Sequence, residues 1–195
     1  MNAVKTHNAI YKMVLIAILA AIIIMLQCFM TFKIGPINLA VTLVPVVLGG
    51  ALLGVWEGTL LGFIFGLSTF LCGVFALDPF TNYLISLNAF TTGTICILKG
   101  TLAGFVPAII IHLLEKRHQE VGIVLGSAAA PIVNTGIFCI TFPIFFMDYL
   151  KTLADGKNVF VFIITGLVGF NFIFEFLVNV ILSTAIAFVV KVIKK

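Results

Sequence analysis

The sequence predicts an all-α integral membrane protein with six transmembrane helices and both termini in the cytoplasm. Of its 195 residues, 62% are hydrophobic and only 9% are charged, whereas a soluble domain carries about 25% charged residues. Nearly all the charges lie at the ends of long apolar runs, and helices of about 20 residues in these runs can cross a bilayer. The basic residues gather in a few connecting segments, which indicates a positive-inside bias.

The predicted spans divide the chain, treated as one domain over residues 1–195, into six apolar segments. The first is a span rather than a signal sequence, because no charge interrupts the chain from Met13 to Phe32 and signal sequences have a shorter apolar region. Proline and glycine inside the later spans are compatible with helices, because neighbouring helices satisfy the freed backbone groups. The expected spans are residues 9–31, 39–55, 58–77, a segment that begins between Thr91 and Leu98 and ends at Leu114, 122–147, and 159–190.

Charge counting gives the expected topology. With the N-terminus inside, the inner segments hold seven basic residues and the outer segments hold three. This ratio favours two cytoplasmic termini. The segment 78–98 is apolar enough to form a seventh span, but it would place the lysine-rich C-terminus outside. We therefore expect it to be a long outer loop, partly re-entrant, and long loops in compact proteins are usually functional.

Lys99 and Glu175 are the two charged residues that lie well inside apolar runs. A charge at bilayer depth costs roughly 3 kcal/mol, so it usually faces a partner, a cavity or a ligand. Lys99 lies 15 residues before Leu114, or about 22 Å of helix from the inner end. It therefore either extends to the outer headgroups or forms the wall of an outward-opening pocket, where an ammonium would bind a carboxylate or phosphate.

Glu175 lies deeper, on a helical face that it shares with Asn171 and Asn179. This polar stripe must face protein, either as a hydrogen-bond network between helices or as a ligand contact. An ion pair between Glu175 and Lys99 stays open at this point. Further polar residues in the fifth span are candidates for the same pocket: Asn134, Thr135 and Thr141.

Several function classes lack support in the sequence. The histidines, cysteines, aspartates and glutamates do not occur at the spacing of metal ligands, and the sequence contains no glycine-rich nucleotide-binding loop. No nucleophile has a base and an orienting group, so an enzyme is not favoured. The net charge of +4 fits topology rather than nucleic-acid binding. The four cysteines form no CxxC pair and are interpreted as small apolar residues.

Taken together, these features resemble the substrate-binding S components of energy-coupling factor (ECF) vitamin transporters. The resemblance covers nearly the whole chain. It rests on the order of five features: Ala17 and Ala21 in the first span, the glycine-rich segment 43–70, Lys99-Gly100, Asn134-Thr135 and the segment 169–179. The chain departs from some members in having no tryptophan in its first outer loop.

The resemblance implies a high-affinity vitamin site on the outer side of a bacterial cell membrane, formed by spans four to six. It also implies a transmembrane T subunit and two cytoplasmic ATPases as partners, so that ATP is used by those partners and this chain needs no cofactor. Docking would use Ala17, Ala20 and Ala21. Binding would use Lys99, Asn134, Thr135, Thr141, Asn171 and Glu175, with Asn38, Asn82 and Asn88 in gating loops.

The substrate is expected to be a small flexible acid, with pantothenate favoured because Lys99 would bind a carboxylate. Folate and riboflavin stay open, because 20 phenylalanines offer stacking surfaces. Two other function classes also stay open. One is a stand-alone secondary carrier that couples protons through Glu175, and the other is a membrane scaffold whose polar stripe only packs helices.

Overall fold

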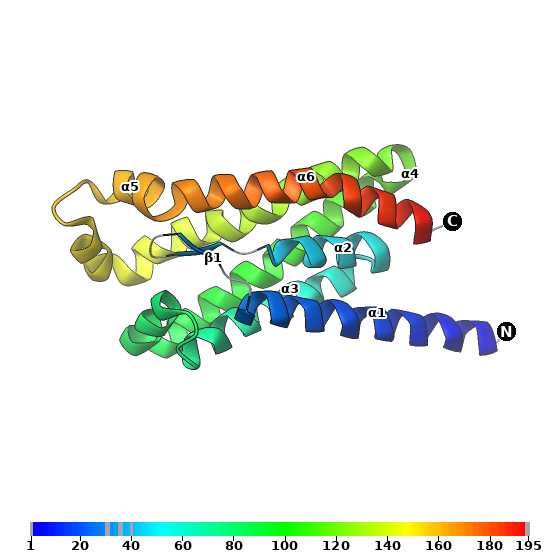
Figure 1. Ribbon diagram of the computed structural model, residues 1–195, viewed down its shortest axis with the longest axis horizontal. Coiled ribbons are helices and arrows are strands. Elements are labelled where there is room, and N and C mark those ends of the chain that lie inside the picture. Colours follow the sequence, from blue (N-terminus) through cyan, green and yellow to red (C-terminus); the bar gives the residue numbers. More distant parts are fainter. Residues whose placement is uncertain (1, 30–31, 35–36, 40, 194–195) are drawn as a thin grey trace.

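The computed structural model describes residues 2–29, 32–34, 37–39 and 41–193, and these ranges are almost entirely helical. The helices run roughly along one long axis, and the start of α1 and the end of α6 lie at the same end of it (Figure 1). We call this the terminal end and the opposite one the distal end. In order, the elements are α1 (Asn2–Phe29), strands β1 (Phe32–Ile34) and β2 (Ile37–Leu39), α2 (Leu43–Leu53), α3 (Val55–Val74), α4 (Pro79–Ala154), α5 (Val159–Phe162), the π-helix η1 (Ile163–Val168) and α6 (Gly169–Ile193).

Helix α4 is a chain of four helical pieces rather than one straight helix. Its backbone leaves helical geometry at Asn88, His118 and Phe146. The first and last pieces are short and lie at the distal end, and the two between them are long. We call the long pieces the first limb and the second limb of α4. The pieces are residues 79–87, 89–117 (first limb), 119–145 (second limb) and 147–154.

The two limbs of α4 are antiparallel, because the chain turns back at His118 (Figure 1). Gly122 packs against Leu114 shortly after the turn, and Gly126 packs further along against Ile111 and Pro107. The first limb thus runs from the distal to the terminal end, and the second limb returns.

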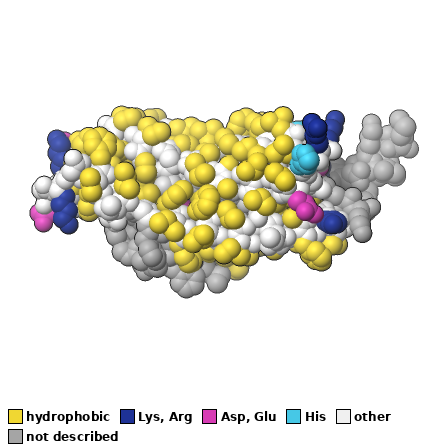
Figure 2. Space-filling model, turned by 90° about the horizontal axis from the view of Figure 1, so that it is seen from above, with side chains coloured by type: hydrophobic (Ala, Val, Ile, Leu, Met, Phe, Trp, Pro, Cys, Tyr) yellow, Lys and Arg dark blue, Asp and Glu magenta, His cyan; other side chains and the backbone are white. Residues whose placement is uncertain are grey.

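The surface pattern is that of a multi-pass membrane protein. Figure 2 shows an apolar belt over the middle of the molecule, with charged side chains gathered at its two ends. Helix α2 has only 11 residues and so rises about 16 Å, roughly half of a bilayer core. Among the described residues, four helices contain stretches long and apolar enough to cross a membrane: Ile10–Phe29, Val55–Val74, Pro79–Ala154 and Asn171–Ile193.

Glycines bring α3 and the first limb of α4 into backbone contact. A methyl group on Gly100 would lie only 2.6 Å from the Cα of Gly66, and one on Gly62 would meet the backbone of Gly104 at 2.9 Å. Small residues at such spacing let two helices pack closely within a membrane. The contact fixes the position of Lys99 next to Gly100.

The prediction of a long outer loop at 78–98 is wrong, because this segment is helical except at Asn88. The carboxylate of Asp78 accepts a hydrogen bond from the backbone N–H of Phe80 at 3.2 Å, and Pro79 occupies the first helical position, where it is well tolerated. Asn88 starts the first limb in the same manner, since its side chain accepts from the N–H of Thr91 at 3.0 Å. Two capping residues therefore turn the expected loop into a bent helical connection.

Other boundaries differ in smaller ways. Helix α1 begins at Asn2 rather than at residue 9. The expected first outer loop contains an antiparallel hairpin in which Lys33 lies opposite Asn38. The last span contains the π-helix η1, which ends at Val168.

Two apolar clusters hold the bundle together. The larger one joins α1, α2, α3, the limbs of α4 and α6, and contains Ile23, Leu43 and Leu61. The smaller one lies toward the distal end around Phe142 and Leu150. A cavity is enclosed between them.

Candidate functional site

The cavity lies in the distal half of the bundle, between α1, α3, both limbs of α4 and α6. Its lining atoms enclose about 950 Å³ of empty space, which includes solvent at the mouth. Small-molecule sites are mostly apolar with a few convergent polar groups, and the lining of this cavity has that character. The polar and charged lining residues are Gln27, Thr69, Asp78, Thr81, Thr92, Lys99, Asn134, Thr135, Asn171 and Glu175.

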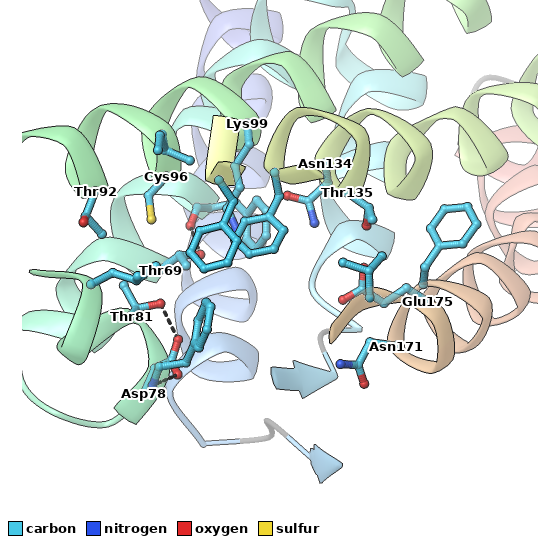
Figure 3. A pocket seen from close by; sticks show the side chains of 18 of the residues that line it. Thr69, Asp78, Thr81, Thr92, Cys96, Lys99, Asn134, Thr135, Asn171 and Glu175 are labelled. Atoms are coloured by element: carbon cyan, nitrogen blue, oxygen red, sulfur yellow. Dashed lines mark hydrogen bonds between the residues drawn. The ribbon is translucent and has the colours of Figure 1, made fainter. Parts of the chain in front are cut away.

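Five of the residues predicted for a binding pocket line this one cavity: Lys99, Asn134, Thr135, Asn171 and Glu175. Figure 3 shows them on three separate helical pieces, with Lys99 on the first limb, Asn134 and Thr135 on the second limb and the other two on α6. Residues up to 76 positions apart in the sequence therefore come together through the turn at His118 and the packing of α6.

The ammonium of Lys99 faces an aromatic ring in the cavity wall. Its Nζ lies 5.8 Å from the centroid of the Phe138 ring, and the side chain is half-buried. A cation above a ring face is attracted by the negative π-surface, a contribution of about 0.5–2 kcal/mol. This contact holds the charge within the cavity, where an anionic group of a ligand can reach it.

Asn134 contributes a buried amide oxygen to the cavity. Only 8% of this residue is exposed, and its Oδ1 has no hydrogen-bond partner among the described residues. Leaving a buried acceptor unsatisfied costs roughly 1–3 kcal/mol. A ligand hydroxyl or amide N–H that donated to this oxygen would remove that cost.

The polar stripe of α6 faces protein as predicted. Asn171, Glu175 and Asn179 are all less than a tenth exposed. Asn171 and Glu175 line the cavity, whereas Asn179 lies one turn toward the terminal end and donates from its Nδ2 to the backbone oxygen of Glu175 at 2.9 Å. The distal part of the stripe thus faces the cavity, whereas Asn179 hydrogen-bonds within its own helix.

Phenylalanine rings form the apolar wall. Phe138 stacks on Phe142 with centroids 4.9 Å apart, and Phe80 packs its edge against Phe138 at 6.1 Å. Beyond Phe142 the rings continue to Tyr149, which packs on Tyr83 at 4.5 Å. Burial raises the pKa of the Tyr149 phenol, so this ring stays neutral at physiological pH.

Three predicted binding residues, Thr141, Asn82 and Asn88, do not line the cavity. Thr141 donates its hydroxyl to the backbone oxygen of Ile137 at 2.7 Å. Asn82 donates from Nδ2 to the backbone oxygen of Gly73 at 2.8 Å, and exposed Asn88 starts the first limb. Asn38 belongs to β2, but its side chain lies outside the described part of the structure.

The three alanines predicted for docking lie on α1. Ala17 and Ala21 are exposed, whereas Ala20 is half-buried and packs on the larger apolar cluster. A small, open face on α1 is therefore available to another helix.

Sequence reasoning missed several polar lining residues. Thr92 and Cys96 precede Lys99 by seven and three positions, so their helical spacing from Lys99 could have found them. Asp78 and Thr81 were not predicted, and the Thr81 hydroxyl donates to the Asp78 carboxylate at 2.5 Å. Gln27 is an isolated amide in an apolar run, and it accepts a hydrogen bond from the hydroxyl of Thr42 at 3.1 Å.

Across the described ranges, no three His, Cys, Asp or Glu side chains are grouped to hold a metal ion.

The structure thus defines a membrane-embedded helical bundle with a distal cavity into which polar groups converge. The family follows from comparison with known proteins. The family model described as the substrate-specific component of ECF transporters matches residues 11–191, and the chain belongs to this family. The predicted family is thereby confirmed.

A curated relative agrees with this assignment. The pantothenic acid transporter PanT of Lactococcus lactis subsp. cremoris (strain MG1363) is 26% identical over 185 residues, which cover 88% of this chain and 89% of that protein. A search of solved structures finds no match.

Proposed function

We propose that this chain is the high-affinity substrate-binding subunit of an ECF-type ABC importer in the bacterial cell membrane, and that its vitamin is pantothenate. The observation that carries the proposal is that one cavity holds both the Lys99 ammonium and the amide oxygen of Asn134, which has no hydrogen-bond partner among the described residues. The relative named as a pantothenic acid transporter adds support.

The cavity offers complementary groups for each part of pantothenate, which has a carboxylate, a central amide, two hydroxyls and a geminal dimethyl group. The carboxylate would pair with Lys99 in a charge-assisted hydrogen bond. The amide N–H or a hydroxyl would donate to Oδ1 of Asn134. The dimethyl group would pack on the rings of Phe138 and Phe142, which stack 4.9 Å apart.

The arrangement in the membrane is part of the proposal. One domain would cross six times, through α1, the short α2, α3, the two limbs of α4, and α5 to α6. Both termini would be cytoplasmic, because the positive-inside bias places the seven basic residues of the terminal side there. The cavity lies in the distal half, so it would then open toward the outside.

Delivery would require partner subunits. The exposed Ala17 and Ala21 on α1 would dock on a transmembrane T subunit that carries two cytoplasmic ATPases. Those ATPases would use the ATP, and this chain would catalyse no reaction. A proton-coupled carrier that works through Glu175 is the competing mechanism, since Glu175 is 7% exposed and lines the cavity.

Mass spectrometry of small molecules released from the purified protein tests the substrate. We expect pantothenate in the released fraction. Release of folate or riboflavin instead would make that vitamin the substrate. If no small molecule is released, the result would favour the scaffold. Uptake into vesicles tests the mechanism. Uptake is expected only when the T subunit and ATPases are present, and proton-driven uptake by this chain alone would establish the carrier.

A further inference from the structure

Two cysteines far apart in sequence meet beside the cavity. The Sγ atoms of Cys28 and Cys72 are 3.2 Å apart, although 44 residues separate them. Cys28 is the next-to-last residue of α1, and Cys72 lies in the last turn of α3. Both therefore lie toward the distal end of their helices, in the half of the molecule that holds the cavity.

The backbone around this pair presents residues of the cavity. Gln27, next to Cys28, lines the cavity. The backbone oxygen of Cys72 accepts hydrogen bonds from the N–H groups of Leu77 at 2.9 Å and Asp78 at 3.2 Å. The turn that places Asp78 in the lining is thus anchored on Cys72, so both cysteines are directly connected to lining residues.

The two thiols differ in access. Cys28 is half-buried, whereas Cys72 is 3% exposed. An oxidant from the outer solution reaches Cys28 first, and Cys72 is in place to resolve the product. The other two cysteines differ, since Cys96 lies in the lining and Cys139 is half-buried on the second limb.

We propose that Cys28 and Cys72 form a thiol pair that low-molecular-weight disulfides oxidise to an intramolecular disulfide, which ties α1 to α3 beside the cavity. The Cys28 thiolate attacks one sulfur of the oxidant and expels a first thiolate. The Cys72 thiolate then attacks Sγ of Cys28 in the mixed disulfide and expels a second thiolate. Two electrons pass to the oxidant, which becomes two thiols by taking up the two protons that the cysteines lose.

The geometry requires little movement. A disulfide bond measures about 2.0 Å, so the two sulfurs need to approach by about 1 Å. Rotation of side chains at two helix ends supplies such a shift without moving the glycine contact of α3 with the first limb.

The bond also restrains the helix that leads into the β1–β2 hairpin. Helix α1 leads from Cys28 into the β1–β2 hairpin, and β2 packs against α6, which carries Asn171 and Glu175. Figure 3 shows the hairpin close to these two side chains. With α1 fixed to α3, separation of the hairpin from the cavity is restricted, so ligand exchange slows. This consequence rests on the proposed binding function, whereas disulfide formation does not.

Peptide mapping by mass spectrometry tests the bond. Purified, reduced protein in lipid nanodiscs is treated with oxidised glutathione. A Cys28–Cys72 cross-linked peptide is expected in wild type and in the control variant Cys139→Ser. The variant Cys72→Ser should instead retain glutathione on Cys28. Absence of the cross-linked peptide in wild type, or glutathione on Cys139 in preference to Cys28, would overturn the proposal.

Thermal unfolding and ligand release test the restraint. The oxidised protein should unfold at a higher temperature than the reduced protein, and a reducing agent should reverse the shift in wild type and Cys139→Ser alike. The dissociation rate of labelled pantothenate should fall by a factor of about three or more after oxidation. An unchanged rate with a confirmed bond refutes the restraint on the cavity. If pantothenate does not bind even to reduced protein, the proposed substrate fails, while the cross-linked peptide and the thermal shift still decide the thiol pair.

Discussion

Replacing Lys99 with methionine should remove the cationic anchor of the cavity while preserving its shape. Methionine keeps an unbranched apolar side chain beside Phe138, so packing in the half-buried wall changes little. The change removes the charge that is positioned 5.8 Å above the Phe138 ring. We therefore expect weaker binding of an acidic ligand without loss of the folded protein.

The size of the effect follows from the environment of Lys99. Two unit charges 4 Å apart attract by about 4 kcal/mol at the effective dielectric of about 20 typical near a protein surface. Desolvation of both groups offsets part of this, and hydrogen bonds to charged groups contribute a net of about 1.5–3 kcal/mol. Because Lys99 is half-buried rather than buried, the lower part of this range applies. The expected loss of about 1.5–2 kcal/mol raises the Kd roughly 10- to 30-fold.

Isothermal titration calorimetry with two ligands isolates the charge. Pantothenate carries the carboxylate, and pantothenol has an alcohol in its place. Wild type should prefer pantothenate, and Lys99→Met should bind the two with similar affinity. Equal loss for both ligands would indicate general damage to the cavity, and an unchanged Kd for pantothenate would refute the role of Lys99.

Three further variants have distinct expected outcomes. Asn134→Leu should weaken pantothenate binding about tenfold by calorimetry, yet leave the Tm of the ligand-free protein equal or higher, because it removes a buried unsatisfied oxygen; a lower Tm would show that the amide is structural. Gly100→Ala should destabilise the protein by about 1–3 kcal/mol in thermal or denaturant unfolding, because the added methyl would lie 2.6 Å from the backbone of α3; wild-type stability would refute the close contact. The double variant Ala17→Leu with Ala21→Leu should retain binding and lose uptake in cells, and normal uptake would exclude this face from docking.

The membrane fold and the polar centre could be predicted from the sequence because charges inside apolar runs are costly. That cost alone singles out Lys99 and Glu175, and helical spacing then assigns Asn171 to the same face as Glu175. All three line the cavity. Thr141 is predicted only as a further polar residue of the span that contains Asn134, and its hydroxyl is satisfied by the carbonyl oxygen one turn before it.

Other features depend on contacts that no local pattern encodes. Each strand of the β1–β2 hairpin has three residues, too few to show an alternating pattern. The contact of Cys28 with Cys72 arises only when α1 packs on α3. The helix after Asp78 could have been predicted, because aspartate followed by proline is a typical helix start, but a seventh span would have placed the lysine-rich C-terminus outside.

Direct titration of the purified protein with pantothenate, riboflavin and folate tests the central claim most directly. We predict saturable binding of pantothenate at one site, with a Kd in the nanomolar to micromolar range, corresponding to about 8–12 kcal/mol, and no comparable binding of the other two vitamins. Tight binding of riboflavin or folate with none of pantothenate would contradict the substrate that the Lys99–Asn134 cavity predicts.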